Sequence, residues 1–243
     1  MTYLFVSDLH LDGDSPAALE TFVDFLASGT GAAAALYILG DLFETWIGDD
    51  DPDPARDRVC RGLARLCAAG TPVFVMRGNR DFMLGSGFES RTGCRLLPDP
   101  VVAELHGRRI LLTHGDLLCT ADHAYQELRS TVRDPAFAER MLRLPTAHRQ
   151  ALANAARAGS RAHTATAQDS IMDVEPAAVL AALRSARADC LVHGHTHRPG
   201  IHELAVDGHA ITRLVLDAWH EHGSVLALSP QGWERRLLEF RRP

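Results

Sequence analysis

Short apolar segments that end in polar residues recur along this chain, and they restrict the folds that it can adopt. Each segment is only a few residues long and is bounded by turn residues, which is typical of buried strands. The five segments are LFV (4–6), ALYIL (35–39), PVFVM (72–76), RILLT (109–113) and CLVH (190–193). Helical patterns lie between them, with starts indicated at Ser15-Pro16 and Asp53-Pro54. This alternation predicts βαβ units around a largely parallel sheet.

Later parts of the chain modify this alternation. Four segments predict hairpin strands, at about 201–206, 211–216, 224–229 and 233–240. The added strands make a mixed, two-sheet α/β sandwich the expected fold. Residues 121–186 are nearly all helix-forming, with Phe137, Met141 and Leu144 at helical spacing, and predict an inserted helical lobe. We therefore expect one domain over residues 1–243, with this lobe as an insertion.

The charge and cysteine content exclude several classes of protein. The formal net charge is −6, with 25 basic residues that are all arginine, which argues against a nonspecific nucleic-acid-binding protein. The five cysteines are scattered without a CxxC pair, so we expect no disulfide framework or zinc ribbon and a reducing compartment. The chain starts without a basic signal-peptide region and has no membrane-length apolar run. We expect a cytosolic protein, unless it lies on a membrane surface.

Polar, potentially metal-binding residues follow each of the five predicted strands. They are Asp8-x-His10, Gly40-Asp41, Gly78-Asn79-Arg80-Asp81, His114-Gly115-Asp116 and Gly194-His195-Thr196-His197. Ligands of an open α/β sheet bind in the crevice outside the carboxyl ends of the strands, where these clusters would converge. A single cluster of this kind is common in ordinary turns. Five in succession, all at strand ends, predict one shared site.

The ordered set of motifs resembles the calcineurin-like dinuclear metallophosphoesterase superfamily. Longer stretches resemble the UDP-2,3-diacylglucosamine hydrolase family, the manganese enzymes of lipid A biosynthesis. These stretches are ILGDLFETWIGDDD, RGNRDFMLG, LTHGDLLCTAD, SIMDV, VHGHTHRP and DAWHEHGS. The resemblance runs from Leu4 to about Ser224. It implies the two-sheet αββα-type sandwich of that superfamily, with the insertion at about 121–186 as a cap.

The resemblance also implies a set of seven ligands for two Mn²⁺ ions per chain. One ion would be held by Asp8, His10 and His197, the other by Asn79, His114 and His195, with Asp41 bridging them. Oxygen and imidazole ligands without thiolate suit Mn²⁺ and disfavour a structural zinc. Two such ions can share a hydroxide and clamp the attacking and leaving oxygens of a displacement at phosphorus. The implied reaction class is phosphoester or phosphoanhydride hydrolysis, with Asp41, Arg80 and His195 as catalytic residues.

Arg80 departs from the wider superfamily, in which many members have histidine at this position. A guanidinium stays protonated, so Arg80 cannot serve as a general acid. A phosphate monoester, whose second pKa is about 6, can leave as an anion without a proton. Arg80 therefore favours a pyrophosphate substrate, whose leaving charge a fixed cation would stabilise. The alternative is an arginine that is merely paired with Asp81 or another acid.

The inserted lobe is strongly basic. Residues 129–161 contain seven arginines and two acids, a net charge of +5, so the rest of the chain carries −11. Basic residues interleaved with apolar ones suit a lobe that meets phosphates or anionic headgroups and an apolar chain. The alternative is a solvated helical face over a small core.

The resemblance implies that the lobe caps the site and receives acyl chains. Substrate contacts would come from Asn79, Arg80, Asp122, Arg157, Ser160, Thr164 and His195. Thr164 and Ala167 replace residues that are commonly Asn and Lys in the family.

The expected function is hydrolysis of the pyrophosphate bond of UDP-2,3-diacylglucosamine to UMP and 2,3-diacylglucosamine 1-phosphate. A metal-bridging hydroxide would attack the α-phosphorus. The protein would lie peripherally on the cytoplasmic side of the bacterial inner membrane, without a nucleic-acid or protein partner. Two alternatives stay open: a metallophosphoesterase acting on a soluble nucleotide or a phosphoprotein, and a scaffold that has lost catalysis. The complete set of seven ligands argues against the scaffold.

Overall fold

The computed structural model describes residues 1–166 and 173–241, without the side chains of 161–166. The first of its two sheets contains β1 (Thr2–Val6), β2 (Ala33–Leu39), β3 (Val73–Met76), β4 (Arg95–Leu97), β10 (Gly223–Ser229) and β11 (Gly232–Leu238). The strand order is β11-β10-β1-β2-β3-β4. β1 to β4 are parallel, whereas β10 and β11 are antiparallel additions at one edge.

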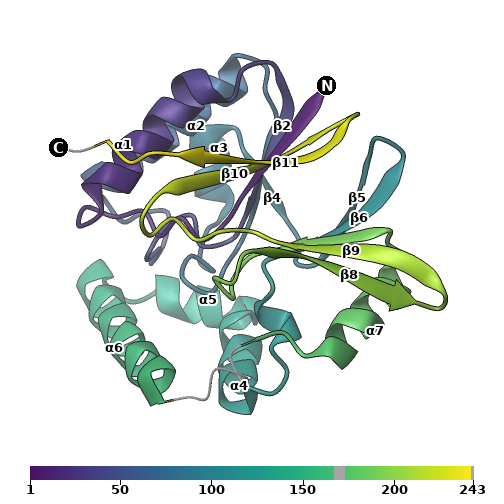
Figure 1. The fold of residues 1–243 in the computed structure, drawn as a ribbon. Coiled ribbons are helices and arrows are strands. Elements are labelled where there is room, and N and C mark those ends of the chain that lie inside the picture. Colours follow the sequence, from purple (N-terminus) through teal and green to yellow (C-terminus); the bar gives the residue numbers. More distant parts are fainter. Residues whose placement is uncertain (167–172, 242–243) are drawn as a thin grey trace.

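The second sheet faces the first (Figure 1). It contains β5 (Val101–Leu105), β6 (Arg108–Thr113), β7 (Cys190–His193), β8 (Gly200–Val206) and β9 (His209–Val215), in the order β5-β6-β7-β9-β8. β6, β7 and β9 are parallel, and the edge strands β5 and β8 are antiparallel. The five early strands and the four later hairpin strands were all predicted within two residues. β4 and β5 were not predicted; β4 is only three residues long, and β5 is mostly partly exposed.

Helices cover the outer faces of both sheets. α1 (Pro16–Asp24), the π-helical turn Phe25–Gly29, α2 (Pro54–Ala68) and α3 (Ser86–Thr92) lie against the first sheet, and α7 (Pro176–Ala186) lies against the second. β2 is therefore buried on both faces: Leu36 and Ile38 pack toward the helices, and Tyr37 and Leu39 pack between the sheets. Burial on both faces explains why the parallel strands are continuous apolar runs. The arrangement confirms the predicted αββα-type sandwich.

Two prolines begin helices as expected, but only one of the preceding residues caps its helix. Asp53 accepts a hydrogen bond from the Arg56 backbone N–H at the start of α2. Ser15 precedes α1 without a side-chain capping bond. Pro16 is compatible with the first helical turn whether or not the preceding side chain caps it, because that turn needs no N–H from it.

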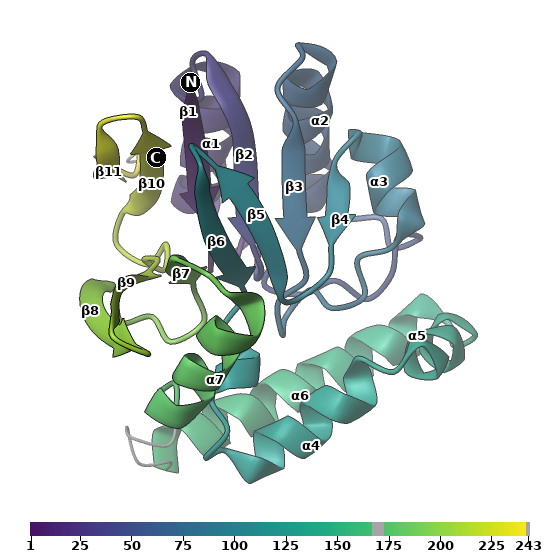
Figure 2. The same ribbon diagram turned by 90° about the vertical axis from the view of Figure 1, so that its right-hand side faces the viewer.

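The remaining helices form a lobe below the carboxyl ends of the strands (Figure 2). This cap lobe consists of α4 (His123–Val132), α5 (Pro135–Leu142) and α6 (Thr146–Thr166). α7, which we had placed in the insertion at 121–186, instead packs on the second sheet through Val179 and Leu183. Its apolar face is needed to bury that sheet, so α7 belongs with the sandwich. No helix among the described residues is long and apolar enough to cross a membrane.

One arginine joins the cap lobe to the loop after β2. The Arg149 side chain on α6 is only 1% exposed. Its guanidinium donates to the Ile47 carbonyl at 2.5 Å, to both carboxylate oxygens of Asp50 at 2.8 and 2.5 Å, and to the Leu144 carbonyl at 3.1 Å. α4 and α5 contain no buried residue. Polar clamps, more than apolar packing, therefore hold the lobe in place.

We expect Arg149→Ala to lower the free energy of unfolding by about 2 kcal/mol, because hydrogen bonds to charged groups contribute roughly 1.5–3 kcal/mol. Urea denaturation measures the change. Arg140→Ala, at an exposed position on α5, serves as the control and should change stability by less than about 0.5 kcal/mol. Equal effects of the two substitutions would contradict a clamp at Arg149.

Candidate dinuclear metal site

Five loops meet at the carboxyl ends of β1, β2, β3, β6 and β7, and they carry all seven candidate ligands. Backbone hydrogen bonds hold the loops together. The Asp8 N–H donates to the Gly40 carbonyl at 3.1 Å, and the His10 N–H donates to the Asp41 carbonyl at 3.0 Å. The Gly194 N–H donates to the His114 carbonyl at 2.9 Å. The site is thus built on strand ends that the sheets already fix.

Backbone strain is concentrated in these loops. Eight non-glycine residues among the described part of the chain have positive φ, and five of them are candidate ligands: Asp8 (53°), His10 (49°), Asp41 (52°), His195 (68°) and His197 (53°). Positive φ is uncommon for residues with a Cβ, and such strain clusters at functional sites. The surrounding hydrogen bonds must therefore force these residues into the orientations seen.

Two glycines permit the close approach of the loops. A Cβ at Gly78 would collide with the carboxylate of Asp41, and one at Gly194 would collide with Ser7 and with the carboxylate of Asp8. Both glycines precede candidate ligands, Asn79 and His195. Both positions therefore require glycine, because neighbouring side chains occupy the space that a Cβ would fill.

The candidate ligands form two overlapping groups of donor atoms. In the first, Asp8, His10 and His197 have donor atoms within 4.8 Å of one another, with 3.4 Å between the Nε2 atoms of the two histidines. In the second, Asp8, Asp41 and His114 meet the same limit. Asp41 lies between the groups, with Oδ2 3.7 Å from His10 Nε2 and Oδ1 3.9 Å from His114 Nε2.

Asn79 and His195 complete the second group. The side-chain oxygen of Asn79 lies 3.0 Å from His114 Nε2 and 3.0 Å from His195 Nδ1. The structure thus brings all seven candidate ligands together around one centre.

Three of the histidines are oriented by outer partners. Nδ1 of His10 lies 2.9 Å from the Glu44 carboxylate, and Nδ1 of His114 lies 2.9 Å from the Leu39 carbonyl. Nδ1 of His197 lies 3.0 Å from His220 Nε2. Each Nε2 is left facing the centre, which is the arrangement that metal-binding histidines adopt. No role for Glu44 or His220 was expected from the sequence.

Buried negative charge dominates the centre. The Asp8 and Asp41 side chains are at most 2% exposed, and Asp8 Oδ1 accepts no hydrogen bond within the described residues. Burial would raise the pKa of Asp8, but His197, whose Nε2 lies 3.4 Å from Oδ1, and the neighbouring histidines hold the pKa below its usual value. The pKa of His114 is raised to about 9 despite burial, because carboxylates led by Asp41 surround it. Buried carboxylates with a free oxygen fit a divalent cation.

The pKa of His195 is lowered to about 4, first by burial and then by the charge of His114. Its ring is therefore neutral, which is the form that binds a metal ion.

Arg80 and Asp81 do not form the pair that we considered as an alternative. The Asp81 carboxylate accepts backbone N–H groups of Leu42 at 2.8 Å and Gly78 at 2.7 Å, so it organises the loops. Burial, followed by the charge of Asp41, raises the pKa of Asp81 to about 6. Arg80 lines a cavity instead, and its buried Nε has no hydrogen-bond partner within the described residues.

That cavity, of about 570 Å³, connects the centre to the cap lobe. Its polar end includes the predicted substrate contacts Asn79, Arg80, Arg157 and Ser160. Apolar side chains form most of the rest of the wall: Trp46, Ile47, Phe82, Met83, Leu128, Val132, Phe137, Met141, Leu152, Ala153 and Ala156. Glu44, Thr45, Tyr125, Arg129 and Arg149 also line it. The cavity therefore combines charged side chains beside the candidate metal centre with a large apolar surface, most of which the cap supplies.

Of the other predicted substrate contacts, Asp122 and His195 are not in this wall. Asp122 caps α4 by accepting a hydrogen bond from the Tyr125 N–H at 3.0 Å. The side chain of Thr164, and Ala167 as a whole, lie outside the described residues.

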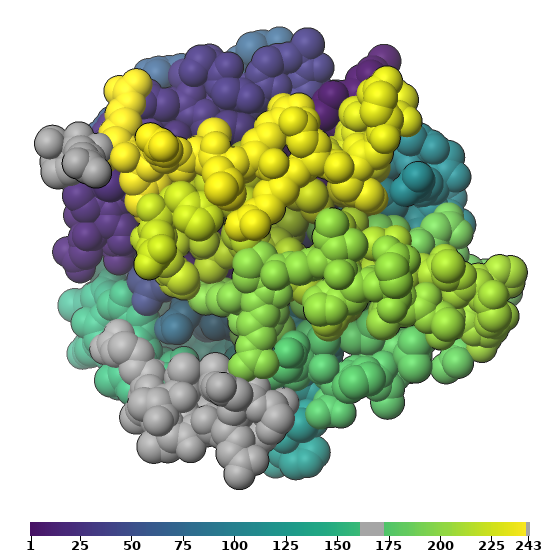
Figure 3. Space-filling model, viewed as in Figure 1, coloured from purple at the N-terminus to yellow at the C-terminus, as the bar shows by residue number. Residues whose placement is uncertain are grey.

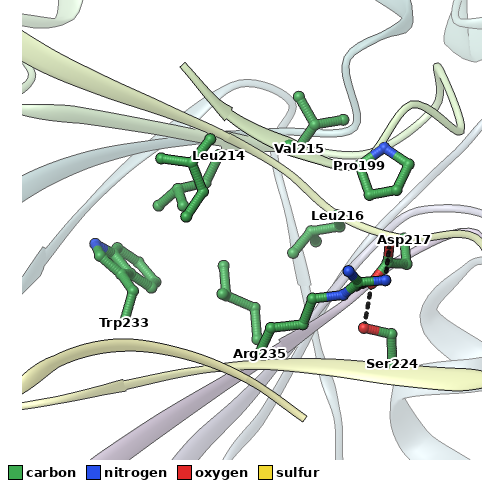
Figure 4. A pocket seen from close by; sticks show the side chains of 11 residues that line it. Pro199, Leu214, Val215, Leu216, Asp217, Ser224, Trp233 and Arg235 are labelled. Atoms are coloured by element: carbon green, nitrogen blue, oxygen red, sulfur yellow. Dashed lines mark hydrogen bonds and ion pairs between the residues drawn. The ribbon is translucent and has the colours of Figure 1, made fainter. Parts of the chain in front are cut away.

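A second cavity, of about 200 Å³, lies where the β8–β9 and β10–β11 hairpins run side by side (Figure 3). Leu214, Leu216 and Trp233 line it, and Arg235 pairs with Asp217 at 2.5 and 2.8 Å (Figure 4). It contains none of the candidate site residues. Its buried carboxylate, Asp217, is already paired with Arg235, so we place the candidate active site at the larger cavity.

Comparisons with known proteins agree with this site. The family model described as calcineurin-like phosphoesterase matches residues 1–199. A protein of Stenotrophomonas maltophilia (strain R551-3), named UDP-2,3-diacylglucosamine hydrolase, is 49% identical over 240 residues, covering 96% of this chain and 97% of that protein. A protein of the same name from Xanthomonas oryzae pv. oryzae (strain PXO99A) is 50% identical over 239 residues, with the same coverage.

Among solved structures, one described as a novel archaeal phosphodiesterase is similar in fold, with a TM-score of 0.53 at 12% identity, covering 98% of this chain and all of that one. Because the family model spans the motif loops and the relatives match nearly the whole chain, this protein belongs to the calcineurin-like phosphoesterases and, within them, to the bacterial UDP-2,3-diacylglucosamine hydrolase family.

Proposed function

We propose that the protein hydrolyses the pyrophosphate bond of UDP-2,3-diacylglucosamine, giving UMP and 2,3-diacylglucosamine 1-phosphate in lipid A biosynthesis. The observation that carries this proposal is the cavity of about 570 Å³ that runs from the candidate metal centre into an apolar cap. A lipid with a phosphate headgroup matches both ends of it. An enzyme for soluble nucleotides or phosphoproteins would have little use for the apolar end.

The seven candidate ligands would hold two divalent ions, for which we propose Mn²⁺. Asp8, His10 and His197 would bind one ion, Asn79, His114 and His195 the other, and Asp41 both. When bound, the two ions would polarise the phosphate oxygens and lower the pKa of water. The protein's part is to hold the rings of His10, His114 and His197 with Nε2 pointed inward, through Glu44, the Leu39 carbonyl and His220.

Arg80 would bind the phosphate that remains with the lipid. It lies on the cavity wall beside Asn79, and its unpaired Nε is free to donate to an anion. Acyl chains in the cap would place the glucosamine 1-phosphate next to Arg80, with the uridine side beyond the centre. The α-phosphorus is then the position of attack, and Arg80 stabilises the departing lipid phosphate without giving it a proton.

The cap would supply the remaining contacts with the lipid. Arg157 lies 3.8 Å from Glu44, too far for a hydrogen bond, and its buried Nε has no partner among the described residues. Its Nη2 donates to Asn154 Oδ1 at 2.5 Å, so Nε is the atom that would donate to a phosphate or a sugar hydroxyl, with Ser160 one helical turn away. Asp122 and Thr164 are proposed as further contacts with the glucosamine, Asp122 at the first residue before α4.

We also propose that residues 1–243 are a single domain that binds the cytoplasmic face of the inner membrane peripherally. Leu142 and Leu144 are exposed by 50% and 37% outside the cavity wall, at the end of α5 and just after it, among the arginines of the cap. Exposed leucines among basic side chains suit an anionic lipid surface. The cap would then receive its substrate directly from the bilayer.

Asp41→Ala should abolish hydrolysis, with a loss of about 10³-fold or more in kcat, because Asp41 faces both groups of ligands. The fold should persist, since the substitution removes one of several crowded buried carboxylates. Turnover is measured with purified, Mn²⁺-loaded protein, and circular dichroism reports the fold. Asp14→Ala, at an exposed loop position, is the matched control. Near-normal turnover by Asp41→Ala would exclude a bridging role.

Hydrolysis in ¹⁸O-labelled water should place the label on UMP and not on the lipid phosphate. This outcome follows from attack at the α-phosphorus with the lipid phosphate as the leaving group. Mass spectrometry of both products after a single turnover reads the result. Label on the lipid phosphate would reverse the proposed direction of attack.

Ala153→Trp should narrow the apolar end of the cavity, because Ala153 lies in its wall. We expect a rise in KM of about tenfold for the long-chain substrate and little change for an analogue with short acyl groups. Ala155→Trp is the control, since Ala155 is exposed on the same helix and outside the wall. The same KM change for both substrates would show that acyl chains do not occupy this cavity.

A further inference from the structure

α4 of the cap lobe presents two neighbouring faces with different partners. Ala124, Leu128 and Val132 are four residues apart and lie in the wall of the large cavity. Residues with this spacing share one face of a helix. Tyr125, Arg129 and Arg133, which directly follows the helix, form the adjacent face and donate hydrogen bonds to the sandwich; Tyr125 and Arg129 lie at the border of the two faces and also line the cavity. One helix therefore contacts the cavity on one side and the loops of the candidate metal centre on the other.

The polar face of α4 converges on Asp116, which follows the candidate ligand His114 by two residues. The Tyr125 hydroxyl donates to Asp116 Oδ2 at 2.7 Å, and Arg129 Nε donates to the same oxygen at 2.9 Å. Gln126 donates to the Asp116 backbone carbonyl at 2.8 Å. Asp116 itself is fully buried. A buried carboxylate is thus the anchor of a helix that has no buried residue of its own.

The same face reaches the other loops of the centre. Arg133 donates to the Gly78 carbonyl at 3.1 Å, immediately before Asn79. The Tyr125 ring stacks on His195, with 5.8 Å between centroids. Three of the five loops that carry candidate ligands are therefore in direct contact with α4.

A second carboxylate extends this network to the backbone of His114. Arg129 Nη2 donates to Asp99 Oδ2 at 3.1 Å. The other oxygen of Asp99 accepts from the Thr113 hydroxyl at 2.6 Å and from the His114 N–H at 3.2 Å. Arg129 thus links two carboxylates that flank one candidate ligand. Hydrogen bonds between charged groups are strong where water is excluded, so this network transmits displacement of the helix to the loop.

We infer that Asp116 is a positioning residue that couples the order of α4 to the divalent-ion affinity of the centre. When α4 is seated, Asp116, Arg129 and Asp99 hold His114 in place. When α4 detaches, the loop loses the partners of a buried carboxylate. By reciprocity of binding free energies, an ion that holds the loops must stabilise α4 to the same extent. The inference rests on the divalent-ion site proposed above but does not depend on the substrate.

The test compares wild type, Asp116→Asn and the control Glu127→Gln, which makes the same carboxylate-to-amide change at an exposed position of α4. Hydrogen exchange of residues 124–132 is measured with and without Mn²⁺, and the Mn²⁺ dissociation constant is measured by calorimetry. In wild type and Glu127→Gln, Mn²⁺ should slow exchange in α4. In Asp116→Asn, the affinity should fall by about tenfold or more and the slowing should disappear.

A second variant keeps the inference testable if Asp116→Asn does not fold. Arg129→Gln leaves the Asp116 carboxylate in place and removes its link to Asp99, so it should also weaken Mn²⁺ binding and reduce the slowing of exchange. In the double variant, the loss of Mn²⁺ affinity should be smaller than the product of the losses in the two single variants, because both substitutions disrupt the same network.

Wild-type affinity in both single variants, or exchange in wild-type α4 that does not respond to Mn²⁺, would overturn the coupling. No lipid substrate is present in these measurements. Failure of the coupling can therefore be told apart from failure of the proposed hydrolysis, which turnover of UDP-2,3-diacylglucosamine tests directly.

Discussion

The arrangement of the loops in this structure depends on two buried carboxylates at neighbouring strand ends. Asp8 and Asp41 have oxygens within 4.8 Å of each other and are almost inaccessible to solvent. Buried like charges are unfavourable unless cations balance them. His10, His114 and His197 lie beside these carboxylates, and the divalent ions that we propose for the site would balance the charge further. The five residues with strained backbones, and the glycines that let the loops approach, are the local consequences.

The distribution of charge follows the same constraint on a larger scale. The mild overall charge of −6 conceals a segment of +5, residues 129–161, and a remainder of −11. In the folded protein, several of these arginines are committed to acids of the sandwich: Arg129 to Asp116 and Asp99, and Arg149 to Asp50. Arg80 and Arg157 keep unpaired Nε atoms on the cavity side. The arginines in and near the cap thus form two groups. One group binds acids of the sandwich and holds the lobe in place, and the other lies on the cavity side, where it could bind an anionic ligand.

The cap also explains how one scaffold of the calcineurin-like family can be directed to a lipid. The candidate metal centre is built entirely on strand ends of the sandwich, whereas most of the apolar cavity wall comes from α4, α5 and α6. In the proposed function, the centre would supply general phosphoester chemistry, and the inserted helices would restrict what can reach it. α4 belongs to both, since its two faces contact the centre and the cavity.

The sandwich and its nine principal strands could be predicted from the sequence, because the spacing of hydrophobic residues and the turn residues are local signals. The convergence of the five motifs could also be predicted, because the carboxyl ends of parallel strands share one edge. The basic cap could be predicted as well. The sequence did not distinguish α7 from the cap helices, because its helical pattern is like that of α4 to α6 and only the folded protein shows that α7 packs on the second sheet. The side chains that support the centre became evident only in the folded protein. Glu44, Asp99 and His220 act across contacts between distant segments, and an isolated acid or histidine carries no local signal of such a partner. Asp116 stands in one of the motifs, but the sequence did not indicate its partners on α4. The same reason applies to Arg80. The residue type alone excluded a general acid. The fold was needed to show that Asp81 accepts backbone N–H groups and that Arg80 lines the cavity instead of pairing with Asp81.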